Sequence, residues 1–105
     1  MKTVIETSTF IKTSREIMSE IEIDNLIEYV SINYNAGDVI PGGNGLRKLR
    51  WSGKGTGKRG GNRIIYLNMT ESEVVLLLAY RKKDKSDISP NEKKKLISSA
   101  LITLI

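Results

Sequence analysis

Cysteine and histidine are both absent from the 105 residues of this chain. The lack of cysteine excludes a disulfide framework and a thiolate metal site. The lack of histidine removes the commonest general base and the commonest metal ligand. Any chemistry must therefore use lysine, arginine, tyrosine, serine or carboxylate side chains.

Long apolar runs are also missing. No segment approaches the ~18 consecutive apolar residues of a membrane-spanning helix. The first residues are not typical of a signal peptide, because the charge of Glu6 comes before any apolar region has built up. We therefore expect a cytoplasmic protein that has no contact with a membrane.

The composition predicts one globular domain. Hydrophobic residues make up 39% of the chain and charged residues 28%, which is typical of folded rather than disordered proteins. A chain of this length can bury one core, and it contains no internal repeat and no linker. We expect a single domain over residues 1–105.

Acidic residues are absent from residues 39–70, and this gap is the most unusual feature of the chain. The segment holds seven of the 17 Lys and Arg residues and eight of the nine glycines. Residues 1–38, in contrast, contain seven acids and only three bases, although the whole chain carries a net charge of +5. Such asymmetry favours an anionic partner on one face, with nucleic acid as the first candidate.

Hydrophobic periodicity predicts an α+β domain with the order β-α-α-β-β-β-α. The expected elements are a strand at 2–6, a helix after the Thr7 to Thr9 cap, a helix at 20–34, strands at 46–52, 63–69 and 74–80, and a helix that begins at Ser89 and Pro90. Gly37 is expected to end the second helix in a left-handed conformation. Ser89 and Glu92 match a capping box for the last helix. The continuously apolar run at 74–80 is typical of an inner strand that is covered on both faces.

Two phosphate-binding motifs are matched only in part. Residues 55–60 read G-T-G-K-R-G and so satisfy G-x-G-x-x-G, but a strand follows them where a dinucleotide site requires a helix. A P-loop fails as well, because Ser52 and Arg59 stand where that motif requires glycine and Ser or Thr. We discard both motifs.

The basic residues of the strand at 46–52 are better candidates for function. Alternation places Lys48 and Arg50 on one face of this strand, and Leu49 and Trp51 on the other. Three cations at 47, 48 and 50 repel one another, which is unusual for a passive surface. Arg63 can point into the same surface. The loop and turn lysines could equally be solvated, and Tyr66, Tyr80 and Trp51 are more often core residues than stacking platforms.

Three blocks of sequence carry a family resemblance. They are G-D-V-I-P-G-G-N-G-L-R-K-L-R at 37–50, G-K-G-T-G-K-R-G-G-N-R-I-I-Y at 53–66, and Y-R-K-K-D-K-S-D-I at 80–88. In these blocks and in the order of its elements the chain resembles the RelE/ParE superfamily of bacterial toxins, and more closely its HigB-type branch. The resemblance covers nearly the whole chain.

This resemblance implies a small RelE-like domain with an antiparallel-rich sheet, two N-terminal helices and a C-terminal helix. It implies a toxin of a type II toxin–antitoxin system that cuts messenger RNA in the A site of the 70S ribosome and so inhibits translation. The implied chemistry uses no metal and no cofactor: a 2′-hydroxyl attacks the adjacent phosphate. The implied partner, besides the ribosome and messenger RNA, is a cognate antitoxin that is HigA-like and binds DNA.

The resemblance also implies roles for the basic residues. The catalytic positions that it implies are Lys48, Arg50, Arg63 and Lys83, or Lys82 if the register differs by one. Apart from the resemblance, the other basic residues are candidates for binding RNA or the ribosome: Arg47, Lys54, Lys58, Arg59, Lys85, Lys93 and Lys94. Some family members have an essential tyrosine a few positions beyond the lysine pair, where this chain has Ser89. A mechanism with that tyrosine as base is therefore not expected here.

The physical hypothesis is that Arg50 and Arg63 stabilise the negative charge of the transition state, because arginine stays protonated and binds phosphate through two donors. Lys48, or a lysine of the 82–83 pair, would exchange the protons, since neighbouring cations disfavour the charged form of a lysine. Two alternatives remain open: a translation inhibitor that binds RNA or the ribosome without cutting, and a ParE-type gyrase poison. Codon preference, oligomeric state, the acid and base roles, and whether the chain is wild type or attenuated are also open.

Overall fold

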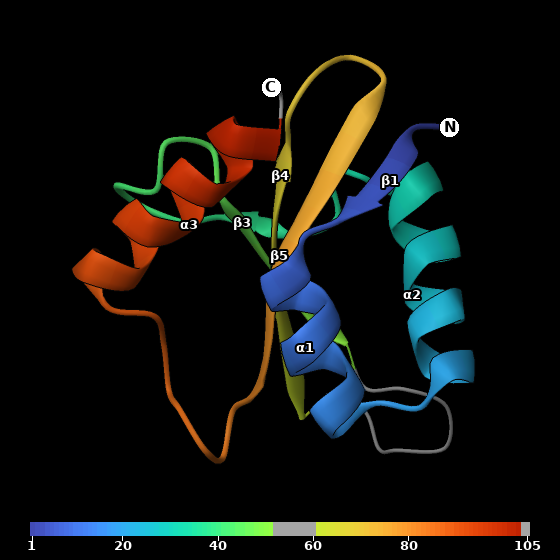
Figure 1. Cartoon of the computed structure of the whole chain (residues 1–105), viewed down its shortest axis with the longest axis horizontal. Helices are drawn as coiled ribbons and strands as arrows, with labels where there is room; N and C mark the ends of the chain where they lie inside the picture. Colours follow the sequence, from blue (N-terminus) through green and yellow to red (C-terminus); the bar gives the residue numbers. More distant parts are fainter. Residues whose placement is uncertain (52–60, 104–105) are drawn as a thin grey trace.

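The computed structural model of the chain describes residues 1–51 and 61–103, and it shows an α+β domain built on one five-stranded sheet. The elements are β1 (Thr3–Glu6), α1 (Ser8–Ile17), α2 (Glu20–Ile32), β2 (Asp38–Val39), β3 (Arg47–Trp51), β4 (Asn62–Asn68), β5 (Glu73–Arg81) and α3 (Pro90–Thr103). Helices α1 and α2 cover one face of the sheet and α3 covers the other (Figure 1). The α+β class and the three helices are confirmed.

The strand order in the sheet is β1-β5-β4-β3-β2. β1 runs parallel to β5, and the other three pairings are antiparallel, which confirms an antiparallel-rich sheet. The two-residue strand β2 was not expected from the sequence, because two residues are too short to show an alternating pattern. The inner strand β5 is buried on both faces, as its apolar sequence predicts.

Side-chain caps begin all three helices. The Thr7 hydroxyl accepts from the Phe10 N–H at 3.2 Å at the start of α1, and Ser19 and Glu22 form a reciprocal capping box for α2. At α3 the Ser89 N–H donates to Glu92 Oε1 at 2.9 Å, and the Glu92 N–H donates to Ser89 Oγ at 3.1 Å. This confirms the capping box that the sequence predicts for the last helix.

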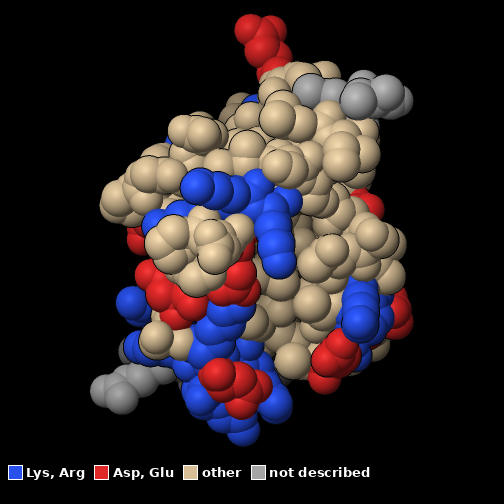
Figure 2. Space-filling view, turned by 60° about the vertical axis from the view of Figure 1, so that its left-hand side comes forward, with Lys and Arg blue, Asp and Glu red and all other residues tan. Residues whose placement is uncertain are grey.

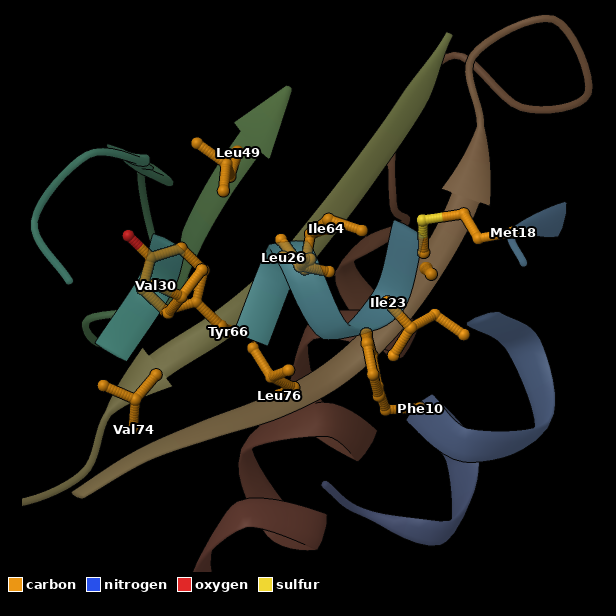
Figure 3. Close-up of a cluster of buried hydrophobic side chains, with 11 residues drawn as sticks. Phe10, Met18, Ile23, Leu26, Val30, Leu49, Ile64, Tyr66, Val74 and Leu76 are labelled. Carbon is orange, nitrogen blue, oxygen red and sulfur yellow. The ribbon is translucent and has the colours of Figure 1, made fainter. Parts of the chain in front are cut away.

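Two apolar clusters fill the space above and below the sheet. The first lies between α1, α2 and the sheet, and it contains Phe10, Ile23, Leu26, Ile64, Tyr66 and Leu76 (Figure 3). The second lies on the α3 face, where Ile65, Val75 and Leu77 pack with Leu96 and Ala100. The sheet is therefore the middle layer of the domain, between α1 and α2 on one face and α3 on the other.

Gly37 does not act as the left-handed cap that the sequence analysis expected. α2 ends at Ile32 with Asn33 as its C-cap, and the glycines with positive φ in the described part of the chain are Gly42 and Gly45. Gly37 instead packs against Tyr66, where an added Cβ would lie 2.8 Å from Cε1 of that ring. Its N–H donates to the Tyr66 hydroxyl at 2.9 Å. Close packing, rather than helix termination, therefore requires glycine at this position.

A β-bulge in β5 changes which side chains face α3. Ile65 pairs with Leu78 but Tyr66 pairs with Leu76, so Leu77 is an extra residue without a partner on β4. Val74, Leu76 and Ala79 pack on the α1/α2 side, whereas Val75, Leu77 and Tyr80 pack on the α3 side. The bulge thus turns Tyr80 towards α3, as bulges beside functional sites often do for one side chain.

Candidate nucleic-acid interface

Three polar side chains form a row across neighbouring strands on the α3 face of the sheet. Arg50 on β3 pairs with Arg63 on β4, and Arg63 pairs with Tyr80 on β5. Directly opposite residues share one face of a sheet with Cβ atoms about 4.5–5.5 Å apart. Arg50 is exposed, whereas Arg63 and Tyr80 each expose only 7% of their surface. We call these three residues the arginine–tyrosine row.

Lys48 lies next to this row on the same face, since it pairs with Ile65 of the α3-side cluster. Its Nζ forms an ion pair with Asp87 Oδ1 at 3.4 Å. The pKa of Asp87 is lowered, chiefly by the Ile88 N–H that donates to the carboxylate at 2.8 Å and then by Lys48. Lys48 therefore has a carboxylate beside it, and not only the cations that the sequence analysis considered.

A groove of about 390 Å³ opens beside this ion pair. Its lining consists of Asp38, Val39, Ile40, Pro41, Lys48, Asp87 and Lys93. Lys93 on α3 reaches across it and donates to the Pro41 carbonyl at 3.3 Å. The groove thus places two of the predicted basic residues, Lys48 and Lys93, on opposite walls.

Lys85 joins the same region from the loop between β5 and α3. Its Nζ lies 5.6 Å from the centre of the Tyr80 ring and forms an ion pair with Glu92. The pKa of Glu92 is lowered, first by the hydrogen bond from Lys85 and then by the Ser89 N–H. Figure 2 shows Lys and Arg side chains gathering on this side of the molecule, with acidic side chains between them.

Tyr80 is the one member of the row whose polar atom is both buried and unpaired among the described residues. Burial raises the pKa of its hydroxyl, and the nearby charge of Asp87 raises it further. The hydroxyl therefore keeps its proton at neutral pH and can act as a hydrogen-bond donor. Arg63 beside it donates from Nη1 to the Asn62 carbonyl at 3.2 Å.

The remaining predicted positions are spread over other parts of the molecule. Lys82 and Lys83 are exposed in the turn after β5, where the Lys82 N–H donates to the Gly61 carbonyl at 2.8 Å. Lys94 lines a separate hollow of about 510 Å³ beside Ser8 and Ile102. Lys54, Lys58 and Arg59 lie outside the described residues.

Arg47 lies on the opposite face from Lys48 and Arg50. It pairs with Tyr66, which belongs to the α1/α2-side cluster. Its Nη1 donates to the Gly37 carbonyl at 2.7 Å and to the Asn35 carbonyl at 3.1 Å. The structure therefore gives Arg47 a role in holding the connection between α2 and β2, away from the arginine–tyrosine row.

The sequence analysis missed two residues of the site, Tyr80 and Asp87. The interpretation of Tyr80 as a core residue is confirmed, since it belongs to the α3-side cluster. Its place opposite Arg63 was not predicted, because strict alternation along β5 does not bring it to that face. Asp87 stands among cations in R-K-K-D-K-S-D, and nothing in that pattern indicates its partner Lys48, which is 39 positions away. Both assignments depend on contacts between distant parts of the chain.

Metal and membrane sites are not evident in the described ranges. No cluster of three or more His, Cys, Asp or Glu residues suited to a metal ion occurs within 1–51 and 61–103. Over the same residues, no helix combines the length and the apolar character needed to span a bilayer.

The comparison with known families agrees with the fold. The model of the family described as the RelE toxin of the RelE/RelB toxin–antitoxin system matches residues 2–104. That match spans every helix and strand described above, including all three strands of the arginine–tyrosine row. The chain therefore belongs to the RelE toxin family and is a toxin of a toxin–antitoxin system.

Proposed function

We propose that this toxin is a HigB-type endoribonuclease that cuts messenger RNA in the A site of the ribosome and so inhibits translation. In the proposed reaction the 2′-oxygen forms a bond to the adjacent phosphorus, and the bond from phosphorus to the 5′-oxygen breaks. The 2′-hydroxyl loses its proton to a base, and the leaving 5′-oxygen gains one. The products are a 2′,3′-cyclic phosphate and a 5′-hydroxyl.

The observation that carries this proposal is the pair of arginines opposite each other on β3 and β4 of a RelE-family toxin. Two like charges directly opposite on neighbouring strands destabilise a sheet. A phosphate between them would remove this repulsion. Arg50 and Arg63 can then stabilise the charge that builds on the phosphate oxygens in the transition state.

Lys48 is the proposed proton-exchanging residue, with Lys82 and Lys83 as further candidates. Lys48 shares the face of Arg50 and Arg63, and its ion pair with Asp87 holds its ammonium group beside them. Lys82 and Lys83 lie at the end of β5 next to Gly61, which precedes β4. Lys85 and Lys93 extend the cationic surface along the groove, where they can bind flanking phosphates.

Dependence on the ribosome follows from the same chemistry. Cations alone lower the barrier only when the attacking oxygen, the phosphorus and the leaving oxygen lie in line. A ribosome that holds the A-site codon in that geometry would supply the missing alignment. The family also implies a cognate antitoxin, and we propose a HigA-like DNA-binding protein in that role.

The test is primer extension on a messenger RNA that is incubated with the purified toxin, with and without programmed ribosomes. We expect cuts only with ribosomes and at A-site positions. Arg63→Ala and Arg50→Ala should each reduce the cutting rate by about 10²–10³-fold, the usual effect of removing one donor to a developing charge. Lys12→Ala, which removes an exposed cation on α1, is the matched control.

Two results would overturn the proposal. Blocked translation without cuts, in the presence of ribosomes, would identify a toxin that binds without cleaving. Normal translation together with DNA damage in cells would identify a gyrase poison. A cutting rate that is the same for Arg50→Ala, Arg63→Ala and Lys12→Ala would reject the arginine assignment alone.

A further inference from the structure

The hydroxyl of Tyr80 has no structural explanation in the fold. Of the two buried tyrosines in the sheet, Tyr66 uses its hydroxyl fully: it donates to the Tyr34 carbonyl and accepts from the Gly37 N–H, both at 2.9 Å. The Tyr80 hydroxyl is buried without a partner among the described residues. Such a group costs stability, and phenylalanine would fill the same space without that cost. A function must therefore be sought for this hydroxyl.

Asp87 is the candidate hydrogen-bond acceptor for the Tyr80 hydroxyl. Ile88, the residue after Asp87, packs in the same buried cluster as Tyr80, and the charge of Asp87 acts on the Tyr80 hydroxyl. The Asp87 carboxylate is held by the Ile88 N–H and, at a long 3.4 Å, by Lys48. A phosphate is a stronger competitor for Lys48 than one exposed carboxylate, because it offers several charged oxygens. Once Lys48 turns to a phosphate, Asp87 is left with one donor and repels the bound anion.

We propose that Tyr80 is a positioning residue. Its hydroxyl donates a hydrogen bond to the Asp87 carboxylate when an RNA phosphate draws Lys48 away from that carboxylate. In this exchange the Lys48 ammonium group leaves the Asp87 carboxylate for the phosphate, and the Tyr80 hydroxyl becomes the new donor to Asp87. The new hydrogen bond keeps the Asp87 carboxylate turned away from the incoming phosphate. This inference rests on the proposed function, because it takes an RNA phosphate to be the ligand of Lys48.

The bulge in β5 supports this assignment. If β5 kept strict alternation from Val74 onwards, Tyr80 would lie on the α1/α2 side with Leu76 and Val74. The bulge places it on the α3 side, where Ile88 also packs. The bulge disrupts a ladder that is otherwise regular, and its effect is to bring the tyrosine to the face of Lys48 and Arg63.

The experiment is a double-mutant cycle on binding, with the wild-type protein, Tyr80→Phe, Asp87→Asn and the double variant. The probe is a programmed ribosome whose A-site codon carries 2′-O-methyl groups, so that no attacking hydroxyl is present and binding is measured without cleavage. We expect Tyr80→Phe to weaken binding by about tenfold or more, the effect of a lost hydrogen bond to a charged group. In the Asp87→Asn background the same change should have almost no effect, because the uncompensated charge is gone.

Two controls separate this role from a structural one. Tyr29→Phe removes the hydroxyl of a tyrosine on α2, on the other side of the sheet, and should leave binding unchanged. The thermal midpoint of Tyr80→Phe should equal or exceed that of the wild type, since a buried unpaired hydroxyl is removed. Weaker binding with unimpaired stability is a combination that a packing defect does not produce.

The outcomes distinguish this inference from the proposed function. Equal effects of Tyr80→Phe with and without Asp87→Asn, or no effect in either background, would overturn the inference. If wild-type toxin binds the ribosome but leaves unmodified messenger intact, nuclease function fails while the cycle still decides the role of Tyr80. If wild-type toxin does not bind the programmed ribosome at all, both are overturned.

Discussion

At the scale of single residues, two tyrosines show how a structural and a functional side chain differ. Tyr66 has both of its hydrogen bonds satisfied and lies against Gly37, whose backbone leaves room for its ring. Burial raises the pKa of Tyr66, as it does for Tyr80. The pKa direction alone therefore does not separate the two roles, whereas the hydrogen-bond partners do.

The contact between Gly37 and Tyr66 leads to a stability prediction. In Gly37→Ala the new methyl group would lie 2.8 Å from Cε1 and 3.0 Å from the hydroxyl of Tyr66, so the ring must move. We expect the free energy of unfolding to fall by about 1–3 kcal/mol, the usual cost of overpacking. Chemical denaturation measures this change.

Gly61→Ala is the matched control for this prediction. An added Cβ at Gly61 meets no described atom within 4 Å, and its φ is not in the left-handed region. Its unfolding free energy should stay near that of the wild type. Equal losses in the two variants would show that backbone freedom, and not the Tyr66 contact, is what Gly37 provides.

At the scale of elements, β3 and β4 place like charges opposite each other. Arg50 and Arg63 are direct cross-strand partners, and such pairs weaken a sheet by about 0.2–1 kcal/mol. The neighbouring pair Leu49 and Ile64 is apolar and buried, so the sheet can tolerate this cost. Stability and ligand binding are therefore in opposition at this one pair.

Arg50→Gln tests this opposition. We expect its free energy of unfolding to rise by about 0.2–1 kcal/mol, because the repulsion is removed from an exposed position. Paired denaturation curves of wild type and variant measure the difference, with Lys12→Gln on α1 as the control that should not change. A loss of stability in Arg50→Gln would mean that Arg50 makes a net favourable contribution to the free protein.

Local signals predicted some elements well and others not at all. The capping box of α3 was predictable because Ser89, Pro90 and Glu92 act within one turn. The bulge at Leu77 was not predictable. The Val and Leu residues before and after Leu77 are similarly apolar, so the sequence does not show where the alternation of β5 is interrupted. The two-residue strand β2 and the true end of α2 also depend on pairing and packing with distant residues.

At the scale of the whole molecule, acidic and basic side chains meet in the segment between β5 and α3. Asp87 and Glu92 pair there with Lys48 and Lys85. Both carboxyl groups have pKa values below their ordinary 3.8 and 4.5. Because the unfolded chain binds protons at higher pH than the folded one, these groups stabilise the fold above their ordinary pKa values and lose that effect as the pH falls.

The resulting prediction concerns acid unfolding. Wild-type stability should fall as the pH drops below about 4.5, and the double variant Asp87→Asn, Glu92→Gln should lose less over the same range. The contribution should stay below about 1 kcal/mol for each pair, since both are partly exposed and water screens them. Unfolding free energies from pH 6 to pH 2 measure it.

Glu16→Gln, which changes an exposed carboxyl group on α1, is the control and should follow the wild-type curve. If the double variant also runs parallel to the wild type, the two ion pairs add nothing to folding. Their role would then be limited to holding Lys48 and Lys85 in place.

The sequence by itself determined the α+β class, the three helices, the N-terminal caps of the first and last helix, the buried inner strand and the concentration of cations at 47–63. These features depend on periodicity, local hydrogen bonding and composition, all of which act over a few neighbouring residues. Only the tertiary structure decided that Arg50, Arg63 and Tyr80 form one row, that Arg47 faces away from it, and that Asp87 holds Lys48. Strand register, one bulge and an ion pair between residues 39 positions apart set these contacts, and no local pattern encodes them.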